Sequence, residues 1–179
     1  MAEQILRRAF VAIEPDSETR NRISLVAGEM RQFGLPMKYV EPENYHINLD
    51  FLGDVGEREL AVQREKWEGI SKSLGYFKIA VRGISAFPNT SAPRVVFAGC
   101  ESTELASLGS RELGREFAPH ITIGRVKRLG GNFGGLFQKL GEIEFGHFIA
   151  KEILLKESTL TREGPIYGTI GEFKLRGRQ

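Results

Sequence analysis

The same short pattern occurs twice in the amino-acid sequence, and this repeat constrains the fold more than any other feature. The apolar run "RAFVAIE" (8–14) is matched by "RVVFAGCE" (94–101), and a helix-compatible stretch follows each of them. Each copy then has a strand-like segment with a histidine at its middle, "YHINLDFL" (45–52) and "FAPHITIGRVK" (117–127). Self-similarity of this kind predicts two copies of one supersecondary unit.

The two copies differ in length between their matching segments. From Glu14 to His46 is 32 positions, whereas from Glu101 to His120 is 19, so the second copy is 13 residues shorter. Two explanations stay open: the second crossover helix is trimmed, or residues near "SLGSRELG" (107–114) are missing from the sequence. The second explanation would leave both histidine segments intact.

Hydrophobic spacing predicts two amphipathic helices. The first follows the candidate N-caps Asp16 and Ser17 and stops at Gly34. The second extends from about residue 57 to residue 74. The predicted inward residues are Ile23, Val26, Ala27, Met30 and Phe33 in the first helix, and Leu60, Trp67, Ile70 and Leu74 in the second.

Strands and turns are predicted for most of the remaining chain. Alternating or short apolar runs indicate strands, and Gly- or Pro-rich stretches indicate turns. The glycine-rich "RLGGNFGG" (128–135) is predicted to be a loop. The predicted strands are "MKYV" (37–40), "FKIAVRGISAF" (77–87), "FGHFIAKEILLKEST" (145–159) and "GPIYGTIGEFKL" (164–175), the last two joined by a turn near residues 164–165.

Composition excludes several classes of function. The chain has 179 residues, 41% hydrophobic and 27% charged, which suits one globular domain or two small fused lobes. A net charge of +2 is too small to argue for a nucleic-acid partner by itself. The single cysteine, Cys100, excludes an internal disulfide framework and the usual zinc spacings. Because no long apolar run occurs, the sequence predicts a soluble, cytoplasmic protein.

The two histidine segments carry the candidate chemistry. Residues at i and i+2 of a strand share one face, so His46 pairs with Asn48 and His120 with Thr122. A duplicated unit would bring these faces together, with two imidazoles, one hydroxyl and one carboxamide. One imidazole can enter neutral as a base and the other protonated as an acid. Arg125 points to the other face of a regular strand, so a cationic contact from it requires a bend.

"YHINLDFLG" and "PHITIGR" resemble the paired His-x-Thr/Ser-x motifs of the 2H phosphoesterase superfamily, and specifically the LigT-like RNA 2',3'-cyclic phosphodiesterases of the 2'-5' RNA ligase family. The resemblance covers nearly the whole chain and includes "RAFVAI", "AFPN", "PRVVFAG" and the terminal "STLTREGPIY". It implies an α/β (α+β) fold formed by a single domain over residues 1–179. This domain would have two pseudo-symmetric lobes, antiparallel sheets lining a central cleft, helices outside, and a chain that crosses between the lobes.

The resemblance also implies a role for each site residue. His120 is the base that activates water, and His46 is the acid that protonates the leaving 3' oxygen, giving a 2'-phosphate. Thr122 and Arg125 would bind the substrate phosphate, and Tyr167 would lie near the cleft. From the residues alone, Arg125 is equally consistent with a solvated strand-edge cation and Tyr167 with a core aromatic.

The implied partners are RNA with 2',3'-cyclic phosphate ends or cyclic nucleotides, with no metal, no other cofactor, no membrane and a monomeric chain. One residue departs from the motif: Asn48 stands where Thr or Ser is usual, and its amide NH2 can still donate to a phosphate oxygen. We therefore expect weakened rather than abolished catalysis. Two alternatives stay open, namely an RNA-end binding module with weak or no turnover, and joining of RNA ends through a 2'-5' linkage.

Overall fold

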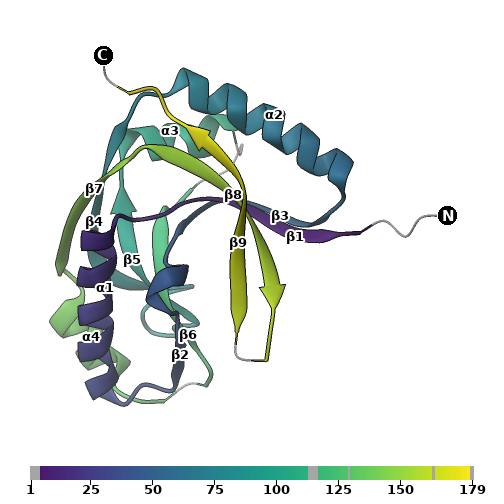
Figure 1. The fold of residues 1–179 in the computed structure, drawn as a ribbon. Coiled ribbons are helices and arrows are strands. Elements are labelled where there is room, and N and C mark those ends of the chain that lie inside the picture. The colour runs from purple at the N-terminus through teal and green to yellow at the C-terminus, as the bar shows by residue number, and fades with distance from the viewer. Residues whose placement is uncertain (1–4, 113–116, 129, 163, 178–179) are drawn as a thin grey trace. The chain divides into compact units, whose positions relative to one another are not determined.

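The computed structural model describes residues 5–112, 117–128, 130–162 and 164–177 (Figure 1). The chain divides into two compact units, each built from segments that are distant in the sequence. Unit 1 contains residues 1–14, 48–77 and 149–179, and unit 2 contains residues 15–47 and 78–148. Both histidine segments contribute to unit 2, because its first segment ends at residue 47 and its second includes residues 117–127.

Unit 1 is formed by a sheet in the order β3-β1-β8-β9 and one helix, α2. β1 pairs with β8, and β8 with β9, in antiparallel register. The apolar run at the start of the chain becomes a central strand, in which residues 9–13 are all buried. Its elements are β1 (Arg7–Ile13), β3 (Ile47–Val55), α2 (Glu57–Ser73), β8 (Glu152–Leu160) and β9 (Pro165–Lys174).

Unit 2 has a sheet in the order β7-β4-β5-β6, with β2 on β6 and the first residue of β3 also on β6. The pairs β4/β5, β5/β6 and β2/β6 are antiparallel. The elements are α1 (Ser17–Met30), the 3₁₀ turns η1 (Arg31–Phe33) and η2 (Pro42–Asn44), β2 (Met37–Tyr39), β4 (Phe77–Phe87), β5 (Val95–Glu101), α3 (Thr103–Glu112), β6 (His120–Val126), α4 (Phe133–Leu140) and β7 (Glu144–Ala150).

Alternation along the strands of unit 2 separates a core face from a more open face. On β5, Val96, Ala98 and Cys100 are buried, whereas Val95 and Phe97 are only half-buried. Helix residues supply the other part of the core, because their apolar stripes are buried as well. The buried residues of these helices are Ile23, Val26, Ala27 and Met30 on α1, Leu105 and Leu108 on α3, and Phe133, Leu136 and Leu140 on α4.

Most predicted elements are confirmed, including both predicted amphipathic helices and the strands of the repeat. Asp16 caps α1, because its carboxylate accepts a hydrogen bond from the Thr19 backbone N–H at 2.8 Å. Gly34 has a left-handed φ of 62° and ends the turn that follows this helix. Phe33 lies in that 3₁₀ turn rather than in α1 and is half-buried.

Two predictions in the second half are wrong. The glycine-rich segment is not a loop throughout, because α4 begins at Phe133, capped by Asn132 through a 2.9 Å hydrogen bond from the Gly135 N–H. The segment 145–159 is not one strand: β7 ends at Ala150, and β8 begins at Glu152. The break has a clear cause, since β7 pairs with β4 in unit 2, whereas β8 pairs with β1 and β9 in unit 1.

The short second crossover is partly described. α3 occupies Thr103–Glu112, which confirms a helix after β5. The possible gap in the sequence near residues 107–114 falls partly on residues 113–116, which lie outside the described residues. None of the helices in the described part of the chain is long and apolar enough to span a membrane.

Candidate active site

The two histidine segments meet in the sheet of unit 2. Ile47 pairs with Ile121 in antiparallel register, and both side chains are fully buried. In such a pair the residue before one partner lies opposite the residue after the other, which places His46 across from Thr122. His46 and His120 are then diagonal neighbours on one face, with Cα atoms roughly 7–8 Å apart by ordinary sheet geometry.

The histidines stand at strand ends, and the prediction that each occupies the middle of a strand is wrong. His120 is the first residue of β6, and His46 directly precedes β3. In both copies the ring is hydrogen-bonded to the chain that enters the strand. His46 Nδ1 lies 2.8 Å from the carbonyl oxygen of Asn44, and His120 Nδ1 lies 2.8 Å from that of Ala118.

These two hydrogen bonds determine which nitrogen of each ring can do chemistry. A carbonyl oxygen only accepts, so Nδ1 must carry the proton in both rings. Nε2 is then the nitrogen that accepts or donates the proton in a reaction. The repeat therefore presents two imidazoles with the same tautomer on one sheet face, each held by a backbone oxygen two residues earlier in the chain.

Buried neighbours fix the backbone that carries His46. Tyr45 and Ile47, on either side of it, are 1% and 0% exposed. The Tyr45 backbone N–H also donates to the Pro42 carbonyl oxygen at 3.2 Å, within the 3₁₀ turn. Burial raises the pKa of Tyr45 to about 12, so its phenol stays neutral. With both flanking side chains directed into the core, His46 is left to project from the opposite side of the chain.

His120 lies in an apolar environment provided by two phenylalanines. Its ring centroid is 4.9 Å from that of Phe87 and 5.1 Å from that of Phe97. Burial is the main cause that lowers the pKa of His120, and the positive charge of Arg125 lowers it further, against the raising effect of the Ala118 hydrogen bond. A lowered pKa keeps this imidazole neutral near pH 7, which suits a general base.

A β-bulge turns Arg125 toward the face that carries His120. Across the β5/β6 pair, Phe97 is opposite Thr122, but Val96 is opposite Gly124, so Ile123 is an extra residue on β6. One extra residue reverses the alternation beyond it, which brings Arg125 onto the same face as Thr122. Arg125 is exposed and close enough to influence the pKa of His120. The strand is therefore not regular, and the role of Arg125 in binding a phosphate stays a prediction.

Comparison with known proteins shows the family to which the chain belongs. The family model for LigT like Phosphoesterase matches residues 13–97 and 100–167, which include both histidine segments. The chain belongs to this family. An RNA 2',3'-cyclic phosphodiesterase of Archaeoglobus fulgidus is 36% identical over 178 residues, covering 93% of this chain and 99% of the relative. One of Methanothermobacter thermautotrophicus is 35% identical over 181 residues, covering 94% and 98%.

Solved structures share the fold of this LigT-like chain. A crystal structure from Thermus thermophilus has a TM-score of 0.79 at 27% identity and covers 96% of this chain and 100% of its own. Escherichia coli LigT complexed with NADP+ has a TM-score of 0.70 at 19% identity and covers 95% and 98%, a likeness of fold alone. The predicted α+β fold and the predicted family resemblance are thus confirmed.

Four of the six predicted site residues lie together in unit 2 of this LigT-like fold: His46, His120, Thr122 and Arg125. Asn48 and Tyr167 belong to unit 1, so their place in the site stays a prediction. The Oδ1 atom of Asn48 is buried and makes no hydrogen bond to any residue that the structure describes. Tyr167 is half-buried and packs edge-on against Phe10, with ring centroids 5.0 Å apart.

The sequence interpretation missed the two phenylalanines beside His120 and a glycine that pairs with it. Gly99 lies opposite His120 in the β5/β6 pair, and Phe97 lies opposite Thr122. A signal was present in "RVVFAGCE", where alternation places Phe97 on the face away from the buried Val96 and Ala98. A single aromatic residue on the open face of a strand is common, so this pattern alone does not mark Phe97 as part of a site.

Substitution of Gly99 tests how closely the strands pack at this site. A Cβ at Gly99 would lie 2.8 Å from the carbonyl oxygen of Arg82 in the neighbouring strand, so the backbone must shift. We expect Gly99→Ala to lower the free energy of unfolding by about 1–3 kcal/mol, measured by urea denaturation. Gly28→Ala is the control, since nothing lies within 4 Å of a Cβ at this exposed position of α1. That variant should gain about 0.5–1 kcal/mol, and a stabilised Gly99→Ala protein would contradict the close packing.

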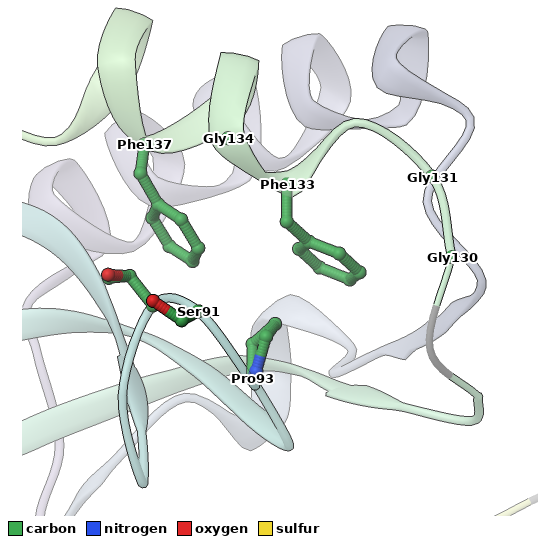
Figure 2. Close-up of a pocket in the computed structure, with 8 residues that line it drawn as sticks. Ser91, Pro93, Gly130, Gly131, Phe133, Gly134 and Phe137 are labelled. Atoms are coloured by element: carbon green, nitrogen blue, oxygen red, sulfur yellow. The ribbon is translucent and has the colours of Figure 1, made fainter.

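A hollow in unit 2 lies away from the predicted residues, since none of them lines it (Figure 2). Its volume is about 530 Å³, and Figure 2 shows Phe133 and Phe137 of α4 directed toward Ser91 and Pro93 of the β4–β5 loop. Across the residues placed in the structure, no three His, Cys, Asp or Glu side chains gather as a metal site would require. The remaining lining residues of the hollow are Thr90, Gly130, Gly131 and Gly134.

Proposed function

We propose that this chain is an RNA 2',3'-cyclic phosphodiesterase that opens the cyclic phosphate to a 2'-phosphate by two-histidine acid-base catalysis. The observation that carries the proposal is the matched anchoring of His46 and His120, whose Nδ1 atoms each donate to a backbone carbonyl at 2.8 Å. The names of relatives at 36% and 35% identity support the substrate class. Two imidazoles with the same tautomer on one face are suited to one proton transfer each.

In the proposed reaction the neutral His120 acts first as the base. Its Nε2 removes a proton from water as the water oxygen forms a bond to phosphorus. The bond from phosphorus to the 3' oxygen breaks, and His46 Nε2 gives its proton to that oxygen, leaving a 2'-phosphate and a 3'-hydroxyl. The two histidines end with exchanged protonation states and return to their starting states through solvent.

Thr122 and Arg125 would stabilise the charge that grows on the phosphoryl oxygens. By strand register from the Ile47–Ile121 pair Thr122 is the residue opposite His46, and the bulge in β6 supports the same face for Arg125. Donors of this kind are most effective when they are held in place before the reaction, as strand residues are. Arg125 adds a charge-assisted hydrogen bond, which is stronger than a neutral one.

Direct assay of the purified protein tests the proposal. We expect hydrolysis of 2',3'-cyclic AMP and of an RNA oligonucleotide with a cyclic end, giving only the 2'-phosphate product. The rate should be unchanged by EDTA, and kcat/KM should follow a bell-shaped dependence on pH. A 3'-phosphate product would reverse the assignment of the leaving oxygen, and loss of activity in EDTA would exclude metal-independent catalysis.

A second candidate function is RNA-end binding with little turnover, and Asn48 is the residue that favours it. Its carboxamide replaces a hydroxyl in the first motif, and its buried Oδ1 has no hydrogen-bond donor in the described part of the chain. Tight binding of a cyclic-ended oligonucleotide without product would support this function. A third, 2'-5' joining, needs a 5'-hydroxyl RNA end in place of water and would give a longer product in the same assay.

Asn48→Thr should raise kcat for the cyclic substrate by roughly 3- to 10-fold, because a hydroxyl both donates and accepts. The gain is measured in steady-state kinetics beside Asn48→Ala, which removes the polar group and should lower kcat below that of the natural protein. Equal rates for all three proteins would show that position 48 makes no contact in the transition state.

A further inference from the structure

Three aromatic rings form a cluster on the open face of the sheet in unit 2. Phe87 of β4 and Phe97 of β5 are stacked, with centroids 4.3 Å apart and an interplanar angle of 27°. The His120 ring meets Phe87 edge-on at 76° and Phe97 at a tilt of 55°. All three side chains are half-buried, and offset-stacked and edge-on contacts of this kind are the arrangements that aromatic rings prefer.

We propose that the stacked pair Phe87–Phe97 is a positioning device for His120, which holds the imidazole in one orientation and shields it from water. The inference rests on the proposed function, because it concerns the base of that reaction. The Ala118 carbonyl fixes one edge of the ring through Nδ1, and the two phenylalanines restrict its rotation about the bond from Cβ. Nε2 of His120 then faces the substrate side of the sheet, and the ring needs no further change of orientation when substrate binds.

The strand register explains why the rings meet. Phe87 is opposite Val95, and Phe97 is opposite Ser85, so the two phenylalanines are diagonal neighbours across the β4/β5 pair. Across the β5/β6 pair of strands Phe97 is opposite Thr122, so Phe97 is a diagonal neighbour of His120. Gly99 lies directly opposite His120 in this pair, and a Cβ at this position would meet the Arg82 carbonyl oxygen of β4 at 2.8 Å.

Exclusion of water by Phe87 and Phe97 has a measurable effect, which is on the pKa of His120. Burial is the largest cause that lowers the pKa of His120, and the phenylalanine rings contribute to that burial. Charged or titratable groups described on neighbouring elements include His46 before β3, Lys38 and Tyr39 on β2, the buried Cys100 on β5, and the Arg82–Glu101 ion pair on β4 and β5. On its own strand, Arg125 acts in the same direction as burial. Replacing a phenylalanine leaves all of these charges unchanged.

Phe97→Leu is the test variant, and Phe137→Leu is its matched control. Both positions hold half-buried phenylalanines of unit 2, and Phe137 lines the separate hollow on α4. We expect Phe97→Leu to raise the pKa of His120 toward its ordinary value, so the acidic limb of the kcat/KM profile moves to higher pH. At pH 6 kcat should fall about 3- to 10-fold with little change in KM, because an interaction that orients the base acts mainly in the transition state.

The test has two readouts, the NMR titration of His120 and the pH profile of kcat/KM. The NMR titration does not depend on catalytic activity. NMR titration of the imidazole protons of the three histidines, assigned with single His→Gln variants, reports the pKa of His120 in the full chain. Phe97→Trp should restore both the titration and the pH profile, since it replaces the aromatic face. Phe97→Met is the substitute if the Leu variant does not fold.

The outcomes separate this inference from the proposed function. If the titration of His120 and the acidic limb both stay where they are in Phe97→Leu, as in Phe137→Leu, the positioning role is overturned. If the natural protein hydrolyses no cyclic phosphate but the titration still moves, the proposed function fails while the control of His120 by the phenylalanines stands. A fall in kcat that Phe97→Trp does not restore also overturns the role.

Discussion

His120→Ala should lower kcat/KM for a 2',3'-cyclic RNA end by about 10²- to 10⁴-fold, the usual contribution of a positioned general base. The cause is the loss of the neutral Nε2 that removes a proton from water. The ring is partly buried and hydrogen-bonded through Nδ1, so Ala also leaves the Ala118 carbonyl without this donor. Folding is therefore checked by circular dichroism and urea denaturation alongside the steady-state kinetics.

His147→Ala is the matched control for this variant. His147 is the remaining histidine of the chain and lies exposed on β7 of unit 2, outside either motif. The His147→Ala variant should retain the full kcat/KM of the natural protein. The acidic limb of the pH profile should vanish in His120→Ala alone, because the group that must be deprotonated is gone. Full activity of His120→Ala would end the two-histidine mechanism.

His46→Ala should cause a similar loss, about 10²- to 10⁴-fold, but only with a leaving group that needs protonation. The 3' oxygen leaves as an alkoxide unless His46 Nε2 supplies a proton. A nitrophenolate leaves without help, so the loss measured with bis(4-nitrophenyl) phosphate should be much smaller. His120→Ala should show a large loss with both substrates, because water must be activated in each case.

This contrast separates the acid from the base. Equal losses with the two substrates in His46→Ala would contradict the acid role and indicate that His46 binds or orients the phosphate. The double variant should be little worse than either single variant on the cyclic substrate, because residues that act as one unit are not additive. Additive losses would indicate that the two histidines work in separate steps.

The pairing of the histidines could be predicted from the sequence, and the face of the sheet on which Arg125 lies could not. The repeat places one histidine segment in each copy, and the Ile47–Ile121 pair confirms that these segments meet. The bulge depends on which residue of β5 lies opposite which residue of β6. Packing between the strands determines this register. Alternation read from one strand alone gives the wrong face for Arg125.

Helix α4 was missed for a related reason. Its sequence, "FGGLFQKL", contains two glycines, which weaken a helix by about 1 kcal/mol each relative to alanine. Phe133, Leu136 and Leu140 are all buried at helical spacing, so tertiary packing outweighs the local preference. Asn132 supplies the N-cap that marks the true start of this helix.

The use of backbone oxygens to hold both histidines affects how the site tolerates substitution. Every amino acid carries the same backbone carbonyl. The side chains at positions 44 and 118 can therefore change without changing which ring nitrogen of each histidine carries the proton. A carboxylate in that place would be lost by a single substitution and would bring a negative charge toward an anionic substrate. Main-chain anchoring makes the tautomer of each ring a property of the fold rather than of a replaceable partner.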